Sequence, residues 1–558
     1  MPDPSVPVPV PVPVPVSEPV SRMRTVPSPA QVGPTPTARP TNTSRNAVLM
    51  VGSALTIAIL NYGLNLMLGW SLSVEAYGQV GVAQTFIFIC VSFLQAGFPY
   101  VVARAVARSV VTEGAADGGS TAWRTYKTAF VSTAALTALL VACLLLAYRL
   151  GWLRLEAAYG PLLALVGVVV LSLGVAAVPN AGLQGLFRFG QISLARLAEV
   201  MLNVVVSVAL VMLGFGAFGA LAGYAAAAIL VCGLYLWFLR DASIWSTKGW
   251  SGIATAWAAL PMTFGVFGTV LLTNVDLLGV KLLTAGAADS DTVVGTYQAA
   301  AVLARAPLFV STALVEVFYP RIAREVALAG SGGRTAAAAD ELMTWLVLGV
   351  LPLSAILMVG APTVLGFFFP ARYAPAAPLL VVLAGSMACL ILAAAITAIL
   401  QASNRPRWAA TAMTSAVLVQ ILGVVLLVPT VGPLGGAAAS LVASALALLL
   451  LLWQARRIGL SIPKLAGHVS TLIWLALLMA PLRYVDADRP LAALWVSLAS
   501  TLYVASCFFV GLLDADHIAR APLLARANRL KRPIQVVLGA ARTLNALGRG
   551  AGYGATSR

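Results

Sequence analysis

Apolar stretches of about 20 residues recur along this chain from Ala47 onward, and they restrict it to folds that a lipid bilayer permits. Each stretch is long enough to cross about 30 Å of hydrocarbon as an α-helix, which satisfies its own backbone hydrogen bonds there. The pattern predicts an all-α polytopic membrane protein with about 14 transmembrane helices. The predicted spans are 47–69, 80–103, 128–148, 160–179, 192–213, 217–239, 253–280, 293–318, 342–368, 376–400, 408–429, 434–454, 466–482 and 491–513.

The composition agrees with this reading. Hydrophobic residues make up 60% of the 558 residues and charged residues only 10%, whereas a soluble domain carries about 25% charged residues. The formal net charge of +16 would suggest a nucleic-acid partner in a soluble protein. Here the basic residues lie between apolar runs, so we predict no nucleic-acid partner and interpret the charge as a topology signal.

The positions of lysine and arginine predict the orientation of the chain, because these residues concentrate in cytoplasmic loops. With the N-terminus inside, most of the 35 basic residues fall in cytoplasmic segments. The outer loops hold only Arg149, Arg154, Lys281, Arg372, Arg483 and Arg489. We therefore predict an even number of spans, cytoplasmic N- and C-termini, and a multi-pass protein of the bacterial inner (cytoplasmic) membrane.

The two ends of the chain lie outside the predicted spans. Residues 1–44 are rich in proline, with alternating Val-Pro, which predicts a disordered cytoplasmic tail. Residues 514–558 form a basic cytoplasmic tail. Its apolar residues from Ile534 to Leu547 fit an interfacial helix on the anionic leaflet, and an unstructured basic tail fits equally well.

Two segments of the chain resemble each other in residues that seldom match by chance. Tyr77 and Arg104 correspond to Tyr297 and Arg324 in one set, and a second set pairs further residues in the same order. The second set matches Leu183, Gln184, Arg188 and Gly219 with Leu400, Gln401, Arg405 and Gly436. Both sets fall at equivalent places in the predicted topology. They predict two parallel six-helix repeats, an arrangement of membrane transporters with a site between the halves.

This duplication divides the chain into predicted units. The N-terminal six-helix lobe covers 45–240, the C-terminal six-helix lobe covers 241–458, and two additional transmembrane helices occupy 459–513.

The chain contains few residues in patterns that are typical of catalytic sites. The five cysteines stand singly in apolar runs, and His468 and His517 are the two histidines, so neither a metal site nor a Ser-His-Asp triad has a residue pattern to support it. The predicted outer loops are also too short for the catalytic domain of a membrane glycosyltransferase. We predict that the protein is not an enzyme and carries no cofactor.

Several segments carry a family resemblance. They are Asn61-Tyr62-Gly63-Leu64-Asn65, Val74-Glu75-Ala76-Tyr77-Gly78, Gly295-Thr296-Tyr297-Gln298-Ala299-Ala300, Leu303-Ala304-Arg305-Ala306-Pro307 and Phe318-Tyr319-Pro320-Arg321. They resemble the polysaccharide biosynthesis and export family, the O-antigen-type flippases of the multidrug/oligosaccharidyl-lipid/polysaccharide exporter superfamily. The resemblance implies two lobes in a V-shaped exporter fold and a central cavity lined chiefly by spans 1, 2, 7 and 8. It also implies alternating access of a lipid-linked sugar.

Polar residues inside the predicted spans are the candidates for contact with such a substrate, because charges in the bilayer are costly and face a cavity or a partner. Arg305 is a candidate donor to a diphosphate, and the alternative is a structural ion pair with Asp276 or Glu316. The amides have an equal alternative as interhelical hydrogen bonds. The predicted substrate-cavity residues are Arg305, Asp276, Asn274, Gln298, Asn61, Asn65, Gln84, Gln95 and Glu316.

The leading functional hypothesis is a flippase that moves a polyprenyl diphosphate-linked glycan, a cell-envelope precursor, across the membrane. Its expected partners are that glycan, membrane lipids, and glycan polymerases or glycosyltransferases. The alternatives are a cation-coupled multidrug exporter, which an acidic cavity with Asp276 would favour, a lipid II-type flippase, and a transport-inactive scaffold for envelope synthesis. Coupling to H⁺ or Na⁺ is compatible with the sequence, which does not name the ion.

Overall fold

The computed structural model describes most of the two predicted lobes. The described residues are 43–96, 98–113, 120–240, 249–250, 260–287, 289–329, 333–403 and 405–457, with single or few residues between 498 and 505 and between 540 and 546. The spans predicted at 466–482 and 491–513 and the two predicted tails lie wholly or almost wholly outside them. Every regular element of the described part is a helix.

The first half of the described chain folds into seven helices that account for six predicted spans, because α2 and α3 together replace the predicted span 80–103. These helices are α1 (Thr43–Ser71), α2 (Val74–Ala96), α3 (Phe98–Glu113), α4 (Ser120–Arg149), α5 (Tyr159–Gly185), α6 (Phe189–Met212) and α7 (Gly216–Phe238).

The second half has a corresponding series of helices. One of them is long, and one predicted span is divided into several shorter elements. Its elements are α9 (Leu260–Leu283), α10 (Ser290–Ala329), α11 (Gly333–Trp345), the π-helical turn η2 (Leu346–Val350), α12 (Leu351–Val359), α13 (Ala361–Phe368), the 3₁₀ turn η3 (Ala371–Ala376), α14 (Ala377–Ala402), α15 (Pro406–Val431) and α16 (Pro433–Arg457).

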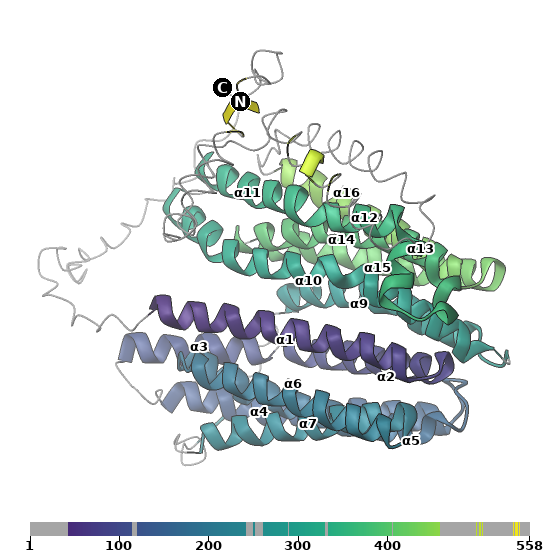
Figure 1. Ribbon diagram of the computed structural model, residues 1–558. Helices are drawn as coiled ribbons and strands as arrows, with labels where there is room; N and C mark the ends of the chain where they lie inside the picture. Colours follow the sequence, from purple (N-terminus) through teal and green to yellow (C-terminus); the bar gives the residue numbers. More distant parts are fainter. Residues whose placement is uncertain are drawn as a thin grey trace, which may run out of the picture. The chain divides into compact units, whose positions relative to one another are not determined.

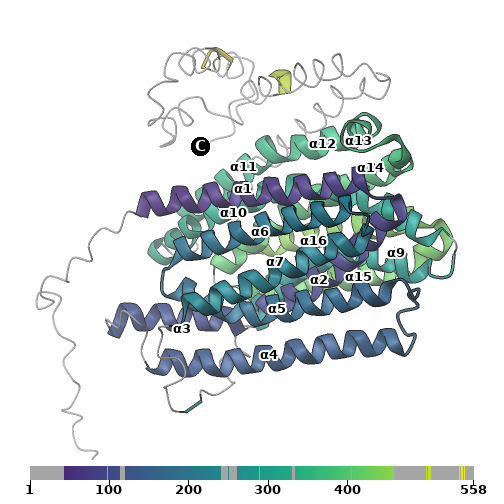
Figure 2. The ribbon, with the colours of Figure 1, turned by 60° about the horizontal axis from the view of Figure 1, so that its bottom comes forward.

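Several helix pairs recur in the two halves, as the duplication predicts. In the first half α6 packs on α7, α7 on α5, and α5 on α2. In the second half the equivalent pairs are α15 with α16, α16 with α14, and α14 with α10. Figure 1 and Figure 2 show α6 and α7 running side by side, and α14, α15 and α16 gathered together. The repeated packing confirms the two-repeat fold class.

A close helix contact also recurs in both halves. In the first half Gly219 of α7 lies against Leu210 of α6, and in the second half Gly435 of α16 lies against Leu427 of α15. A Cβ atom on either glycine would collide with the facing leucine. Small residues allow such approaches in membranes, where packing rather than hydrophobic burial holds helices together.

The predicted span 342–368 is broken rather than continuous. Its end consists of α12 and α13, whose axes differ by 95° across Gly360. Pro362 lies in the first turn of α13, where it cannot donate a backbone hydrogen bond to the preceding helix. The apolar run is long enough for one span, but helix α12 ends within the run, at the sequence Gly360-Ala361-Pro362.

Nine helices of the described part are long and apolar enough to cross a membrane, or ten if the bent pair counts as one span. This supports a multi-pass membrane protein and leaves the predicted total of 14 untested. Large hydrophobic side chains also remain exposed on these helices, as expected of surfaces that face lipid. Examples are Leu139 on α4, Val205 on α6 and Leu422 on α15.

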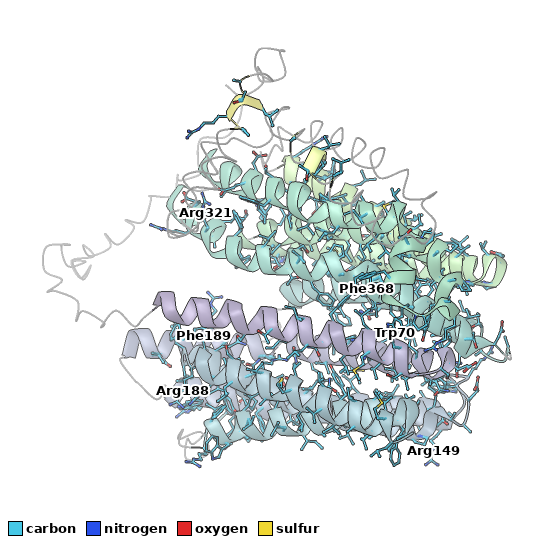
Figure 3. All side chains as sticks on the ribbon, viewed as in Figure 1. Trp70, Arg149, Arg188, Phe189, Arg321 and Phe368 are labelled. Atoms are coloured by element: carbon cyan, nitrogen blue, oxygen red, sulfur yellow. The ribbon has the colours of Figure 1, made fainter. Side chains whose placement is uncertain are left out.

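From Val48 onward the described helices belong to one compact unit, in which α2 packs against both α9 and α10. At the end of α1 the indole of Trp70 donates a hydrogen bond of 2.8 Å to the carbonyl of Phe368, at the end of α13 (Figure 3). Close to it the guanidinium of Arg372 donates to the carbonyls of Gly69, Trp70 and Leu72 at 2.8–3.0 Å. The side chains of Trp70 and Arg372 thus join the two halves at the end of α1.

Candidate functional site

The polar residues predicted on spans 2, 7 and 8 meet where α2, α9 and α10 pack together. Arg305 lies in α10, and its guanidinium donates from Nη2 to the carbonyl oxygen of Thr273 in α9. The Nε atom of Arg305 is buried and has no hydrogen-bond partner among the described residues. The guanidinium therefore keeps unused donor capacity inside the protein.

Asp276 lies three residues beyond Thr273 on α9 and is almost fully buried, with 1% exposure. Its Oδ2 accepts a 2.7 Å hydrogen bond from the hydroxyl of Tyr297 in α10, and its Oδ1 accepts one from the backbone N–H of Leu277. Both oxygens of this buried carboxylate thus have donors, which a charge in a low-dielectric setting requires.

The alternative in which Arg305 and Asp276 form a direct ion pair is not what the described contacts show. Arg305 donates to the main chain of Thr273, while Asp276 binds Tyr297. Each group therefore has a partner of its own: the carbonyl of Thr273 accepts from Arg305, and the hydroxyl of Tyr297 donates to Asp276.

Gln298 and Gln84 meet across the contact between α10 and α2. The Nε2 atom of Gln298 lies 3.4 Å from Oε1 of Gln84. Gly81 of α2 lies directly against the side chain of Gln298, and a Cβ atom there would lie 2.8 Å from it. The Oε1 atom of Gln298 is buried without a partner in the described part. Two amides that are 214 residues apart thus line one seam.

Asn274 contributes a further unpaired acceptor. Its Nδ2 donates to the carbonyl of Val270 and to the hydroxyl of Thr273, both at 2.8 Å. Its Oδ1 is buried without a partner among the described residues. The structure therefore brings five of the nine predicted residues into one region: Arg305, Asp276, Asn274, Gln298 and Gln84.

The remaining predicted residues lie elsewhere or are not described. Asn65 donates at 2.9 Å to the carbonyl of Asn61 within α1, so this bond is local to the helix. Gln95 is exposed near the end of α2. Glu316 lies on α10, and its side chain is outside the described part.

Two tyrosines belong to the site although sequence reasoning did not select them. Tyr297 and Tyr77 are both fully buried, and Tyr297 is the residue that holds Asp276. Tyr77 packs on Phe369 and Tyr373, and its hydroxyl has no partner in the described part. The signal was present, because Tyr77 and Tyr297 are one of the pairs that define the duplication.

The arrangement combines a buried donor, which suits an anionic group, with buried acceptors, which suit hydroxyl groups, and it requires no covalent chemistry. Arg305 offers a buried donor, and the oxygens of Asn274, Gln298 and Tyr77 offer hydrogen-bonding capacity that the protein leaves unused. Buried polar atoms normally find partners, so several orphans in one seam indicate a place for water or a ligand. Within the described residues no group of three or more His, Cys, Asp and Glu side chains is placed to hold a metal.

These features define a class: a multi-spanning helical membrane protein with two equivalent halves and a charge-bearing polar seam between them. The sequence profile of the family described as "Polysaccharide biosynthesis protein" matches residues 44–326. The chain belongs to this family of polysaccharide biosynthesis proteins. A search of curated protein sequences found no match.

The solved structures to which the chain is similar include a lipid flippase and multidrug transporters. The chain is similar to a lipid II flippase MurJ in an inward closed conformation, with a TM-score of 0.63 and 13% identity over 83% of this chain and 99% of that one. It is also similar to a multidrug resistance MATE family transporter of the MOP superfamily in an inward-facing conformation, with a TM-score of 0.53 and 16% identity over 74% and 98%.

A eukaryotic MATE transporter, AtDTX14, has a TM-score of 0.53 and 14% identity over 77% of this chain and 98% of that one. At these identities the comparisons show that the chain shares its fold with these proteins.

Proposed function

We propose that this protein is a flippase that carries a lipid-linked oligosaccharide or related cell-envelope precursor across the cytoplasmic membrane by alternating access. The observation that supports it most strongly is the buried guanidinium of Arg305 with its unpartnered Nε. A diphosphate head group is the kind of anion that such a donor binds through charge-assisted hydrogen bonds.

The surrounding groups suit the sugar part of such a substrate. Sugars are bound by amides and hydroxyls that donate and accept, and Gln298, Asn274 and Tyr77 each carry a buried atom without a described partner. Membership of a polysaccharide biosynthesis family and the flippase named among the structural neighbours agree with this substrate class.

A multidrug exporter for cationic compounds is the second candidate, because MATE transporters share the fold and Asp276 is a buried carboxylate. Asp276 already accepts two hydrogen bonds, from Tyr297 and Leu277, and it carries no described orphan atom. The unused donor is the N–H of Arg305, which favours an anion, and the unused amide oxygens of Asn274 and Gln298 can accept hydrogen bonds from sugar hydroxyls.

The test is translocation in proteoliposomes that contain a fluorescent polyprenyl diphosphate-linked oligosaccharide, read by quenching from outside. Arg305→Ala should lower the rate about tenfold or more, because it removes a charge-assisted donor, and Arg305→Lys should retain part of it. Arg149→Ala serves as the matched control, since it removes the same charge from an exposed position at the end of α4.

Unchanged translocation in Arg305→Ala, at equal amounts of folded protein, would remove the proposed site. Uptake of a cationic dye that depends on Asp276, with no glycan translocation by the native protein, would instead establish the drug exporter. Absence of both activities would support the transport-inactive scaffold.

A further inference from the structure

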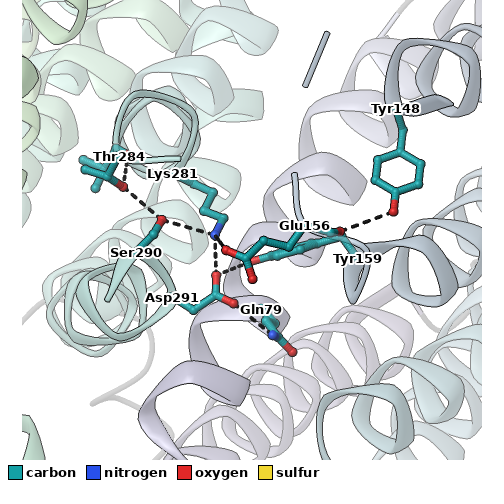
Figure 4. Close-up of polar contacts among 9 residues, drawn as sticks. Gln79, Tyr148, Glu156, Tyr159, Lys281, Thr284, Ser290 and Asp291 are labelled. Carbon is teal, nitrogen blue, oxygen red and sulfur yellow. Dashed lines mark hydrogen bonds and ion pairs between the residues drawn. The ribbon is translucent and has the colours of Figure 1, made fainter. Parts of the chain in front are cut away.

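A second polar cluster, remote from Arg305 along α10, ties the two halves of the protein together at the start of that helix (Figure 4). Asp291 is its centre. The hydroxyl of Tyr159, the first residue of α5, donates to Oδ1 of Asp291 at 2.6 Å, and Nε2 of Gln79 in α2 donates to Oδ2 at 2.9 Å. A carboxylate of the second half is thus bound by two different helices of the first.

Lys281 neutralises this carboxylate from within the second half. Its Nζ lies 2.5 Å from Oδ1 of Asp291 and 3.2 Å from the hydroxyl of Ser290, and its side chain is buried, with 1% exposure. The same Nζ lies 3.5 Å from Oε1 of Glu156 and 5.0 Å from the centre of the Tyr159 ring. The ammonium therefore adds two further contacts to the first half.

The main chains also touch beside this cluster. Gly78 of α2 lies against the carbonyl oxygen of Asp291, and Gly295 of α10 lies against that of Val74, with no space for a Cβ atom at either glycine. The hydroxyl of Thr292 donates to Glu75 at 3.3 Å. Helices that approach to backbone contact leave no passage between them at this level.

The division of charge within the cluster makes it suited to opening. Lys281 and Asp291 come from the same half, so their ion pair survives when the halves separate. The contacts that would break are hydrogen bonds of Tyr159 and Gln79 and the long pair with the half-exposed Glu156, and water can replace each of these. No buried charge would be left without its partner, which is the costly event in breaking an ion pair.

We propose that Lys281, Asp291, Tyr159, Gln79 and Glu156 form a latch that closes one end of the transport path and opens in each cycle. The proposal rests on the proposed alternating access. On the predicted topology the latch lies at the outer face, because residues 149–159 and 281–292 fall in outer loops.

The test measures the distance across the latch and requires no substrate. Spin labels are placed at Trp152→Cys and Ala287→Cys, which are exposed in the loops of the first and second half, in a background whose native cysteines are replaced. Pulsed electron resonance in liposomes then gives the distance distribution. Tyr159→Phe combined with Gln79→Ala should shift the distribution toward the longer distance. The ratio of molecules at the longer distance to molecules at the shorter distance should rise about tenfold.

Tyr148→Phe is the matched control. It also removes a tyrosine hydroxyl at this end, but that hydroxyl binds the carbonyls of Glu156 and Ala157 within the first half, at 3.3 and 3.4 Å. Its distance distribution should equal that of the labelled parent. Each single variant, Tyr159→Phe and Gln79→Ala, is measured separately, so the test stands if the double variant does not fold.

Distances that stay unchanged in Tyr159→Phe and Gln79→Ala would overturn the latch, as would an equal change in Tyr148→Phe. Because the readout is a distance, it is independent of Arg305. A latch that opens as expected without glycan translocation would leave the latch standing and the proposed substrate refuted. Glycan translocation with unchanged distances would refute the latch and leave the proposed substrate standing.

Discussion

Gly295 in α10 packs directly on the carbonyl oxygen of Val74 in α2, so that the backbones of the two halves meet without an intervening side chain. The sequence alone placed these residues in different lobes. Their contact shows that the halves are closed against each other at the end where α2 and α10 begin.

Gly295→Ala should destabilise this closed arrangement by about 1–3 kcal/mol, because the added methyl group overlaps main-chain atoms that cannot move aside as a side chain can. The measurement is the thermal unfolding midpoint of the purified protein in detergent. Gly233→Ala in α7 is the control, since a Cβ atom there meets no atom within 4 Å. A midpoint lowered equally by both variants would contradict the close contact.

Tyr297 and Asp276 should be energetically coupled, because the tyrosine hydroxyl is the side-chain donor that satisfies this buried carboxylate. A double-mutant cycle of Tyr297→Phe and Asp276→Asn should give an interaction energy of about 0.5–3 kcal/mol in unfolding experiments. In a parallel cycle Asp276→Asn is combined with Ser386→Ala, whose hydroxyl binds Ser440 and Ser444, and the effects should add. Additivity in the first cycle as well would mean that the bond contributes nothing.

Arg372 should hold the end of α1, because it donates to three carbonyls of that end. Arg372→Met should speed backbone amide exchange in the last turn of α1, where carbonyls otherwise lack helical partners. Arg149→Met, at the exposed end of α4, provides the comparison. Exchange in α1 that is identical in the two variants would argue against this cap.

The predicted orientation can be tested at two exposed positions of the first half. Trp152 is 76% exposed in the loop after α4, near Arg149, and Gly190 is exposed at the start of α6, near Arg188, at the other end of these helices (Figure 3). In intact cells an impermeant maleimide should label Trp152→Cys. Gly190→Cys should react only after permeabilisation, and the reversed result would invert the topology.

Local chemistry explains why so much of the first half could be predicted. The apolar run 160–179 became α5, Tyr159–Gly185, and 192–213 became α6, Phe189–Met212, because a segment in lipid must satisfy its backbone bonds within itself. The correspondence of Tyr77 with Tyr297 likewise anticipated two halves with equal packing. In the apolar run 342–368, length alone misled, because the sharp break at Gly360 lies within it.

Contacts between side chains of different helices could not be predicted in this way. Hydropathy and charge along the chain were sufficient for the helical class and for the candidate residues Arg305, Asp276 and Gln298, since these depend on neighbours in sequence, and the repeat followed from matching residues in the two halves. The binding of Asp276 by Tyr297 and of Asp291 by Tyr159, 132 residues away, appeared only in three dimensions. Which polar groups meet depends on the rotation and depth of packed helices, and these are determined by side chains from distant parts of the chain acting together.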